Sequence, residues 1–105
     1  MKAAWALACA LMLPGTAFAA DCDAEMPAAH QRIADIKARD PKIDALLKKK
    51  DLKGVCAILK TNVADMTFAR DAMQHCMTGF EKNENVAALN ANLTELTAAI
   101  AMQCR

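Results

Sequence analysis

The sequence predicts an all-α protein, a small antiparallel helical bundle of three main helices and one short helix that is stapled by two disulfides. Three observations support this class. Apolar residues recur at alternating steps of three and four, which is the spacing of helices with one buried stripe. They do not alternate with period two over any useful length, so we expect no strands. Four of the five cysteines follow the apolar N-terminal segment, an even number in a short chain.

The N-terminal segment, residues 1–19, has the pattern of a cleaved signal peptide. Lys2 provides a charged start, residues 3–13 are apolar, and Ala17 and Ala19 place small residues at the two positions that precede a cut after Ala19. The apolar run is well short of the ~20 residues that span a bilayer. We therefore expect a periplasmic or secreted protein in which residues 20–105 form a single helical domain without a membrane anchor.

The charge of the processed chain argues against nucleic acid as a partner. Loss of Lys2 from thirteen basic residues leaves twelve, which balance the twelve acidic residues. A neutral chain lacks the electrostatic attraction that nucleic-acid binding requires. One cluster of like charge, interrupted by Asp51, contains Lys48, Lys49, Lys50 and Lys53. We expect this cluster to be a solvated face rather than an anionic docking patch.

The first predicted helix ends near Arg39. Its apolar stripe comprises Cys22, Met26, Ala29, Ile33 and Ile36. Asp40 and Pro41 then supply an N-cap and a proline at the first position of a short second helix. That helix carries Ile43, Leu46 and Leu47, and Asp51 is expected to cap the element after it.

A long third helix is predicted from Leu52 to Gly79, a residue that suits the position after a helix end. Its stripe keeps phase through residues 61–62, which could otherwise cap a new helix, and comprises Leu52, Cys56, Leu59, Val63, Met66, Arg70, Met73, Met77 and Phe80. Residues 81–85 are expected to form a polar turn. The last helix has the stripe Val86, Leu89, Leu93, Leu96, Ile100 and Cys104. Helices with one apolar stripe each bury those stripes against one another in a bundle with short loops.

The four cysteines that remain after signal cleavage are expected to form two structural disulfides, because an exported chain this small meets an oxidising compartment and has a small core. They are Cys22, Cys56, Cys76 and Cys104. None of them form a C-x-x-C pair, so neither a thioredoxin-like redox site nor a zinc or haem motif is indicated.

The predicted helices favour one disulfide pairing. If residues 52–78 form one helix, Cys56 and Cys76 lie about 30 Å apart, whereas a disulfide tolerates roughly 4.4–6.8 Å between Cα atoms. This favours Cys22–Cys76 with Cys56–Cys104. The alternative, Cys22–Cys104 with Cys56–Cys76, requires a break near residues 61–66 and stays open from the sequence alone.

A cluster of soft ligands suggests a metal-binding alternative. Met73, His75 and Met77, with Met66 further along the helix, offer thioether and imidazole groups that suit Cu(I). However, the three methionines lie on the predicted core stripe, where methionine is an ordinary filler. His30 would add a second imidazole only if the bundle brought it close. We therefore expect no cofactor, and copper handling by Met73, His75 and Met77 is the alternative function.

No residue pattern points to catalysis. Serine is absent, and the candidate acid-base groups have no distinguishing context; they are Asp35, Asp65, Asp71, Glu81 and Glu95. Phe68 lies off the stripe, where it either packs against the short helix or belongs to a partner surface. We expect a non-enzymatic, immunity-like module that binds or inhibits another exported protein. The alanine-rich last helix also permits a homodimer.

Overall fold

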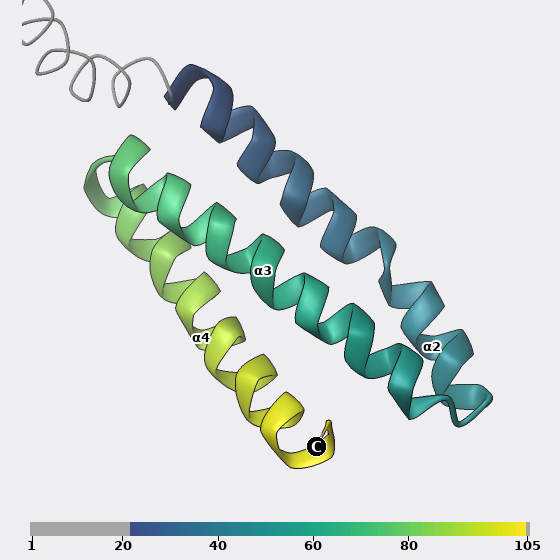
Figure 1. The fold of residues 1–105 in the computed structure, drawn as a ribbon. Coiled ribbons are helices and arrows are strands. Elements are labelled where there is room, and N and C mark those ends of the chain that lie inside the picture. Colours follow the sequence, from purple (N-terminus) through teal and green to yellow (C-terminus); the bar gives the residue numbers. More distant parts are fainter. Residues whose placement is uncertain (1–21, 105) are drawn as a thin grey trace, which may run out of the picture.

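The computed structural model describes residues 22–104, which form a helix at 22–38 followed by α2 (Asp40–Lys48), α3 (Leu52–Cys76) and α4 (Gly79–Gln103), as Figure 1 shows. The predicted class of three main helices and one short helix is therefore confirmed. The predicted signal peptide lies outside the described residues.

Helix α3 is the central element. It packs against α2 and α4, whereas no Cα atoms of α2 and α4 approach each other within 8 Å. The N-terminal helix runs antiparallel to α3, since Cys22 bonds to Cys76 near one end and Arg39 contacts Asn62 nearer the other. Figure 1 shows α4 running alongside α3 as the second arm of a hairpin.

Both predicted disulfides are confirmed. Cys22–Cys76 joins the start of the N-terminal helix to the end of α3, with 5.5 Å between Cα atoms, and Cys56–Cys104 joins the start of α3 to the end of α4, with 5.7 Å. The alternative pairing is excluded, because α3 is continuous between Cys56 and Cys76 and holds them far apart.

The junction between the N-terminal helix and α2 differs from the prediction. The N-cap is Arg39, without a side-chain cap bond, and Asp40 is the first residue of α2. The physical reason is that Arg39 keeps a helical backbone conformation while its side chain bonds to Asp65 and Asn62. The proline nitrogen falls in the first turn, where a missing donor is tolerated.

The turn between α2 and α3 contains the predicted cap. The carboxylate of Asp51 accepts a hydrogen bond from the backbone N–H of Gly54 at 2.9 Å. Lys50 has a φ of 60°, and the N–H groups of Lys50 and Asp51 donate to the carbonyls of Leu47 and Leu46. This is the Schellman arrangement that ends a helix, here with lysine where glycine is usual.

The turn between α3 and α4 corrects the prediction for residues 76–85. Helix α3 ends at Cys76, Met77 and Thr78 are extended, and Gly79, with a φ of 76°, is the first residue of α4. Residues 81–85 are therefore helical, not a turn. Glu81 in the first turn of α4 is favoured by the helix dipole, and residues 80–85 include no proline or glycine that would interrupt the helix.

The core is shallow and built on small residues. Ala29, Ala69 and Ala72 form its buried centre, and Met26, Ile33, Phe68 and Leu89 pack against it. Within residues 22–104 no large side chain is fully buried. A small core of this kind agrees with the need for two covalent crosslinks.

Candidate functional site

A groove crosses α3 between α2 and α4. It is shallow and open to solvent, with a volume of about 360 Å³, and is lined by Asp40, Ile43, Leu59, Asn62, Met66, Asn92, Glu95, Leu96 and Ala99. Both α2 and α4 pack on α3, and no Cα atom of α2 lies within 8 Å of a Cα atom of α4. Apolar side chains from three helices therefore meet along a line that the described residues do not cover.

The floor and the rim of the groove differ in character. Met66 and Asn62 are buried at its base, and Ile43, Leu59 and Leu96 are half-buried on its walls. Asp40 and Glu95 are exposed on opposite sides, one on α2 and one on α4. Among residues 22–104 neither carboxylate is recorded in an ion pair. The result is an apolar trough between two acidic side chains.

A charged network fixes the α2 side of this groove. Nη1 of Arg39 donates to Oδ1 of Asn62 at 2.9 Å and to Oδ2 of Asp65 at 2.7 Å. Nη1 of Arg32 donates to the other oxygen of Asp65 at 2.9 Å. The Asp65 side chain is only 9% exposed, so its charge is balanced by two guanidinium groups rather than by water. Arg39 thereby holds the start of α2 against α3.

No sequence pattern indicates this network. Asp65 is one of five undistinguished carboxylates in the sequence predictions, which single out neither arginine. The available signal for a buried ion pair was a carboxylate on the same helix turn as apolar core residues, because an acidic residue is rarely buried without a partner. Its partners lie 26 and 33 positions away in the chain, so no local pattern identifies them.

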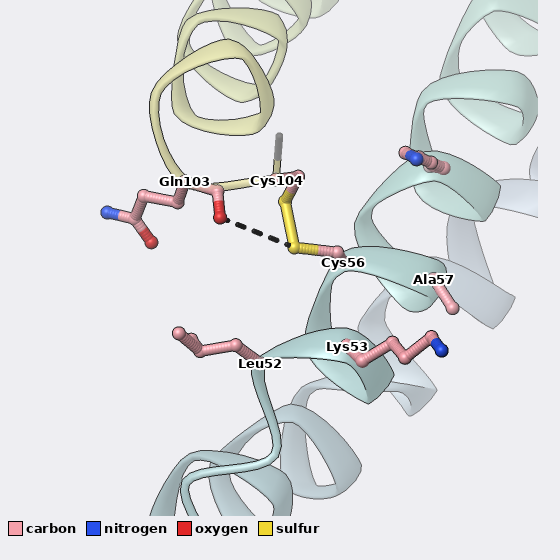
Figure 2. A pocket seen from close by; sticks show the side chains of 7 residues that line it. Leu52, Lys53, Cys56, Ala57, Gln103 and Cys104 are labelled. Carbon is pink, nitrogen blue, oxygen red and sulfur yellow. Dashed lines mark hydrogen bonds between the residues drawn. A yellow bond between two sulfur atoms is a disulfide. The ribbon is translucent and has the colours of Figure 1, made fainter.

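A second hollow, of about 580 Å³, lies beside the Cys56–Cys104 disulfide and is shown in Figure 2. Leu52 is 52% exposed at its edge, and Lys53 and Lys60 lie on the α3 side. The dashed line in Figure 2 marks the 4.0 Å contact between Cys56 Sγ and the Gln103 carbonyl oxygen. The predicted lysine cluster, to which Lys53 belongs, is exposed throughout.

Phe68 lies against the N-terminal helix. The ring packs on the Ala29, Ala69 and Ala72 cluster, and Arg32 Cζ sits 4.4 Å from the ring centroid. This is the geometry of a cation–π contact. The Phe68 ring therefore packs between the alanine cluster and the guanidinium group of Arg32.

The residues proposed for copper are not placed on one face. Met66 and Met73 are buried and Met77 is half-buried. His75 is two positions from Met73, about 200° around the helix, and its Nε2 lies 2.6 Å from a Glu25 oxygen. His30 is exposed on the N-terminal helix. Copper binding by this cluster stays a prediction.

The other candidate carboxylates lie apart, each with its own role. Asp35 accepts a hydrogen bond from Gln31, Asp71 pairs with Arg70, and Glu81 occupies the first turn of α4. These arrangements are ordinary features of helix surfaces.

No protein-family model, curated protein or solved structure matches the chain. Among the described helices, none has the length and apolar character required to cross a bilayer. Function is therefore inferred from the residues of this chain alone.

Proposed function

We propose that the protein is an exported, non-enzymatic binding module, immunity-like or inhibitory, whose binding surface is the groove over α3 between α2 and α4. The occupant that fits best is an amphipathic helix of another exported protein. The observation that carries this proposal is the open line of apolar side chains left where α2 and α4 flank α3 without touching.

The packing of helices supports a helical occupant. Two helices that flank a third leave a groove into which another helix packs at about 8–10 Å between axes, as in a four-helix bundle. Ile43, Leu59 and Leu96 supply half-buried apolar surface on three sides of that position. Residues spaced at i, i+3, i+4 and i+7 on a partner helix match such a groove.

Charge defines the partner further. Asp40 and Glu95 stand on opposite rims without a recorded ion pair in the described part of the chain. A helix with lysine or arginine on both sides of its apolar stripe would be favoured there, and an acidic helix would be repelled.

Export is part of the proposal for two reasons. Residues 1–19 have the features of a cleaved signal peptide. Two disulfides in a chain this small are typical of proteins that work in an oxidising compartment.

A tryptophan-bearing peptide provides a sensitive test. The only tryptophan of the chain is Trp5, in the predicted signal peptide, and tyrosine is absent, so residues 20–105 contribute no fluorescence from either. The probe is an amphipathic peptide of about 18 residues, five helical turns, with a leucine stripe, one tryptophan and lysine flanks. A second peptide keeps the stripe and has glutamate flanks. We expect the lysine peptide to bind more tightly and its emission to shift to shorter wavelength.

Three variants locate the binding. Leu96→Glu places a charge in the groove and should weaken the lysine peptide by more than about tenfold, since 1.4 kcal/mol corresponds to that factor. The double charge reversal Asp40→Lys with Glu95→Lys should invert the preference between the two peptides. Lys60→Glu, in the other hollow, is the matched control and should leave binding unchanged. Equal binding of both peptides, or unchanged binding by Leu96→Glu, would contradict the proposal.

The natural partner can be sought with a photo-crosslinking residue at Asn92, on the groove rim, and with a control at the exposed Gln31. We expect a crosslink from position 92 that Leu96→Glu removes and whose attached segment is an amphipathic basic helix. A crosslink to a second copy of this chain would instead identify a homodimer, and a segment of any other kind would overturn the proposed partner.

A further inference from the structure

Four side chains of the types that bind zinc gather where the N-terminal helix begins and α3 ends. They are Cys22, Glu25, His75 and Cys76, and their sulfur, oxygen and nitrogen donor atoms all lie within 4.8 Å of one another. Two of the four, the cysteines, are joined as a disulfide in the structure. No sequence pattern indicates this group, because no two of the cysteines have a zinc-ligand spacing.

The donor atoms lie close together, and the hydrogen-bonded pair of Glu25 and His75 must open by about 1 Å to admit a metal ion. Glu25 Oε2 lies 2.6 Å from His75 Nε2 and 3.7 Å from Cys76 Sγ. In a tetrahedral zinc site the ligands lie about 2.0–2.3 Å from the metal, which separates neighbouring donors by about 3.3–3.8 Å. The Cα atoms of the two cysteines are 5.5 Å apart, so once the sulfur–sulfur bond is open, side-chain rotations alone can bring the sulfurs to this spacing.

The ligand set is accessible and chemically suited to zinc. The His75 and Glu25 side chains are 42% and 28% exposed, so a metal ion can reach them from solvent. Two thiolates, one imidazole and one carboxylate form a borderline-soft tetrahedral set, which zinc prefers over the oxygen-rich sets of calcium or magnesium. Both helices are fixed nearby by the Ala29 core and the Asp65 ion pairs, which do not depend on this disulfide.

Within residues 22–104, no histidine or carboxylate lines the hollow beside the other disulfide. Cys56 and Cys104 line a hollow with Leu52, Lys53, Ala57, Lys60 and Gln103, none of which is a histidine or a carboxylate. Lysine ammonium groups would repel a cation there. Cys56–Cys104 therefore serves as an internal control, a disulfide of similar loop length whose described neighbours include no histidine or carboxylate.

We propose that the Cys22–Cys76 disulfide is the oxidised form of a zinc site, and that reduction converts it into a Cys22, Cys76, His75 and Glu25 centre. Two thiols of a reductant, or one dithiol, deliver two electrons and two protons to the disulfide, giving two cysteine thiols and the oxidised reductant disulfide. Zinc then displaces the two thiol protons to solvent and is held by both thiolates, by His75 Nε2 and by a Glu25 oxygen. The protein thus exchanges a covalent crosslink for a metal crosslink between the same two helices.

The zinc site is spatially separate from the proposed binding groove. The four ligands lie at the end of α3 that carries Cys76, whereas the groove residues of α3 span Leu59 to Met66. Failure of the zinc site leaves the peptide-binding experiments unaffected, and their failure leaves the zinc site unaffected.

The first test compares the oxidised and reduced forms of the processed protein without oxygen. Zinc affinity is measured by competition with a chromophoric chelator, and cobalt(II) serves as the spectroscopic probe. We expect the reduced protein to bind one equivalent of zinc more tightly than micromolar and to show thiolate-to-cobalt charge-transfer bands. The oxidised protein should show neither. Absence of stoichiometric binding by the reduced protein contradicts the proposal, provided that far-UV circular dichroism shows it is folded.

Matched variants assign the ligands. The double variant Cys22→Ala with Cys76→Ala should abolish zinc binding, whereas Cys56→Ala with Cys104→Ala should retain it. His75→Gln and Glu25→Gln should each weaken binding at least as much as loss of an outer-shell partner does, about 10–100-fold. If the reduced chain bound zinc only as an unfolded polypeptide through its four thiolates, these two substitutions would leave the affinity unchanged, and that result would overturn the site.

A further variant removes dependence on the reduced fold. Cys22→His cannot form the disulfide with Cys76 but supplies an imidazole in its place, while Cys56–Cys104 stays oxidised. We expect this protein to bind one zinc under non-reducing conditions and to gain thermal stability from it, because a ligand that binds only the folded state stabilises that state. Adding His75→Gln to Cys22→His should remove the gain. If Cys22→His and the reduced wild type both fail to bind zinc, no metal site exists at this position.

Discussion

The two faces of α3 are built differently. Towards the N-terminal helix, the contact consists of a charged network at Asp65, an arginine over Phe68 and a cluster of alanines. Towards α4, the contacts include the buried Leu93, Leu89 packed on the alanine cluster, and a hydrogen bond from Arg70 to Asn90. Each face is closed by one disulfide, at opposite ends of α3.

The two faces of α3 therefore use two different kinds of helix–helix contact. The α4 face depends on apolar area, which is non-directional and tolerates small shifts between helices. The face towards the N-terminal helix depends on hydrogen-bonded charges, which fix one register because each oxygen of Asp65 has its own arginine. The same face brings His75 and Glu25 together beside a disulfide.

The largest expected loss of stability comes from removing a disulfide, and comparing the two disulfides compares the two faces of α3. The disulfides close loops with separations of 54 and 48 residues, for which chain entropy predicts about 4 kcal/mol each. Replacing either cysteine pair by alanine should therefore lower the free energy of unfolding by about the same amount, measured by urea denaturation with far-UV circular dichroism. A much larger loss for Cys22–Cys76 would show that the polar face cannot hold the N-terminal helix without its crosslink.

The next effect concerns Asp65 itself. Asp65→Ala removes the acceptor that Arg32 and Arg39 share and leaves Arg39 with Asn62 alone, so we expect a loss of about 2–3 kcal/mol. This is below the range for fully buried pairs, because the arginine side chains are 26% and 42% exposed and can regain water. Asp71→Ala is the matched control, since it removes an exposed pair with Arg70 and should cost less than about 1 kcal/mol. Equal losses for both variants would show that the Asp65 network stabilises the fold no more than an exposed ion pair does.

The apolar face is tested by Leu93, the only buried residue of α4. Leu93→Ala should lower stability by about 2 kcal/mol, the low end for such truncations, because a hollow lined by Arg70 and Thr97 already lies beside it. Met102→Ala, at an exposed position on the same helix, should change stability by less than about 0.5 kcal/mol. A Leu93→Ala loss close to that of Met102→Ala would mean that disulfide Cys56–Cys104, not packing, holds α4.

The sequence predicted the apolar face and the crosslinks because their information is local. The apolar stripes predicted two long helices, and an unbroken helix holds Cys56 too far from Cys76 for a bond. The sequence left a break near residues 61–66 open, and the continuous α3 of the structure excludes it. The polar face escaped because Arg32, Arg39 and Asp65 become partners only after the helices are placed. The same holds for Glu25 and His75, which are 50 positions apart. The predicted helix boundaries at Asp40 and Gly79 were wrong for a related reason. A local capping pattern does not decide where a helix begins or ends when tertiary contacts of neighbouring residues favour another position.

The two joints of α3 provide the smallest and sharpest contrast, because both contain a residue at positive φ but only one is glycine. Lys50, with φ of 60°, ends α2 on the polar side, and Gly79, with φ of 76°, begins α4 on the apolar side. For an L-residue with a side chain, this conformation costs roughly 1–2 kcal/mol. Glycine avoids that cost, but its greater freedom in the unfolded chain lowers the stability of the folded state by about 0.4–1 kcal/mol. Lys50→Gly should therefore raise stability by about 0.5–1 kcal/mol.

Gly79→Ala should lower stability by a similar amount for the reverse reason. A Cβ at position 79 meets nothing within 4 Å, so the loss would come from the backbone alone and not from a clash. The two changes are opposite in sign, and both are read from urea midpoints of otherwise identical proteins. If Gly79→Ala instead raised the free energy of unfolding, α4 would begin after residue 79 in solution. The contact between α3 and α4 would then be shorter, and the face towards the N-terminal helix would be the more ordered side of α3.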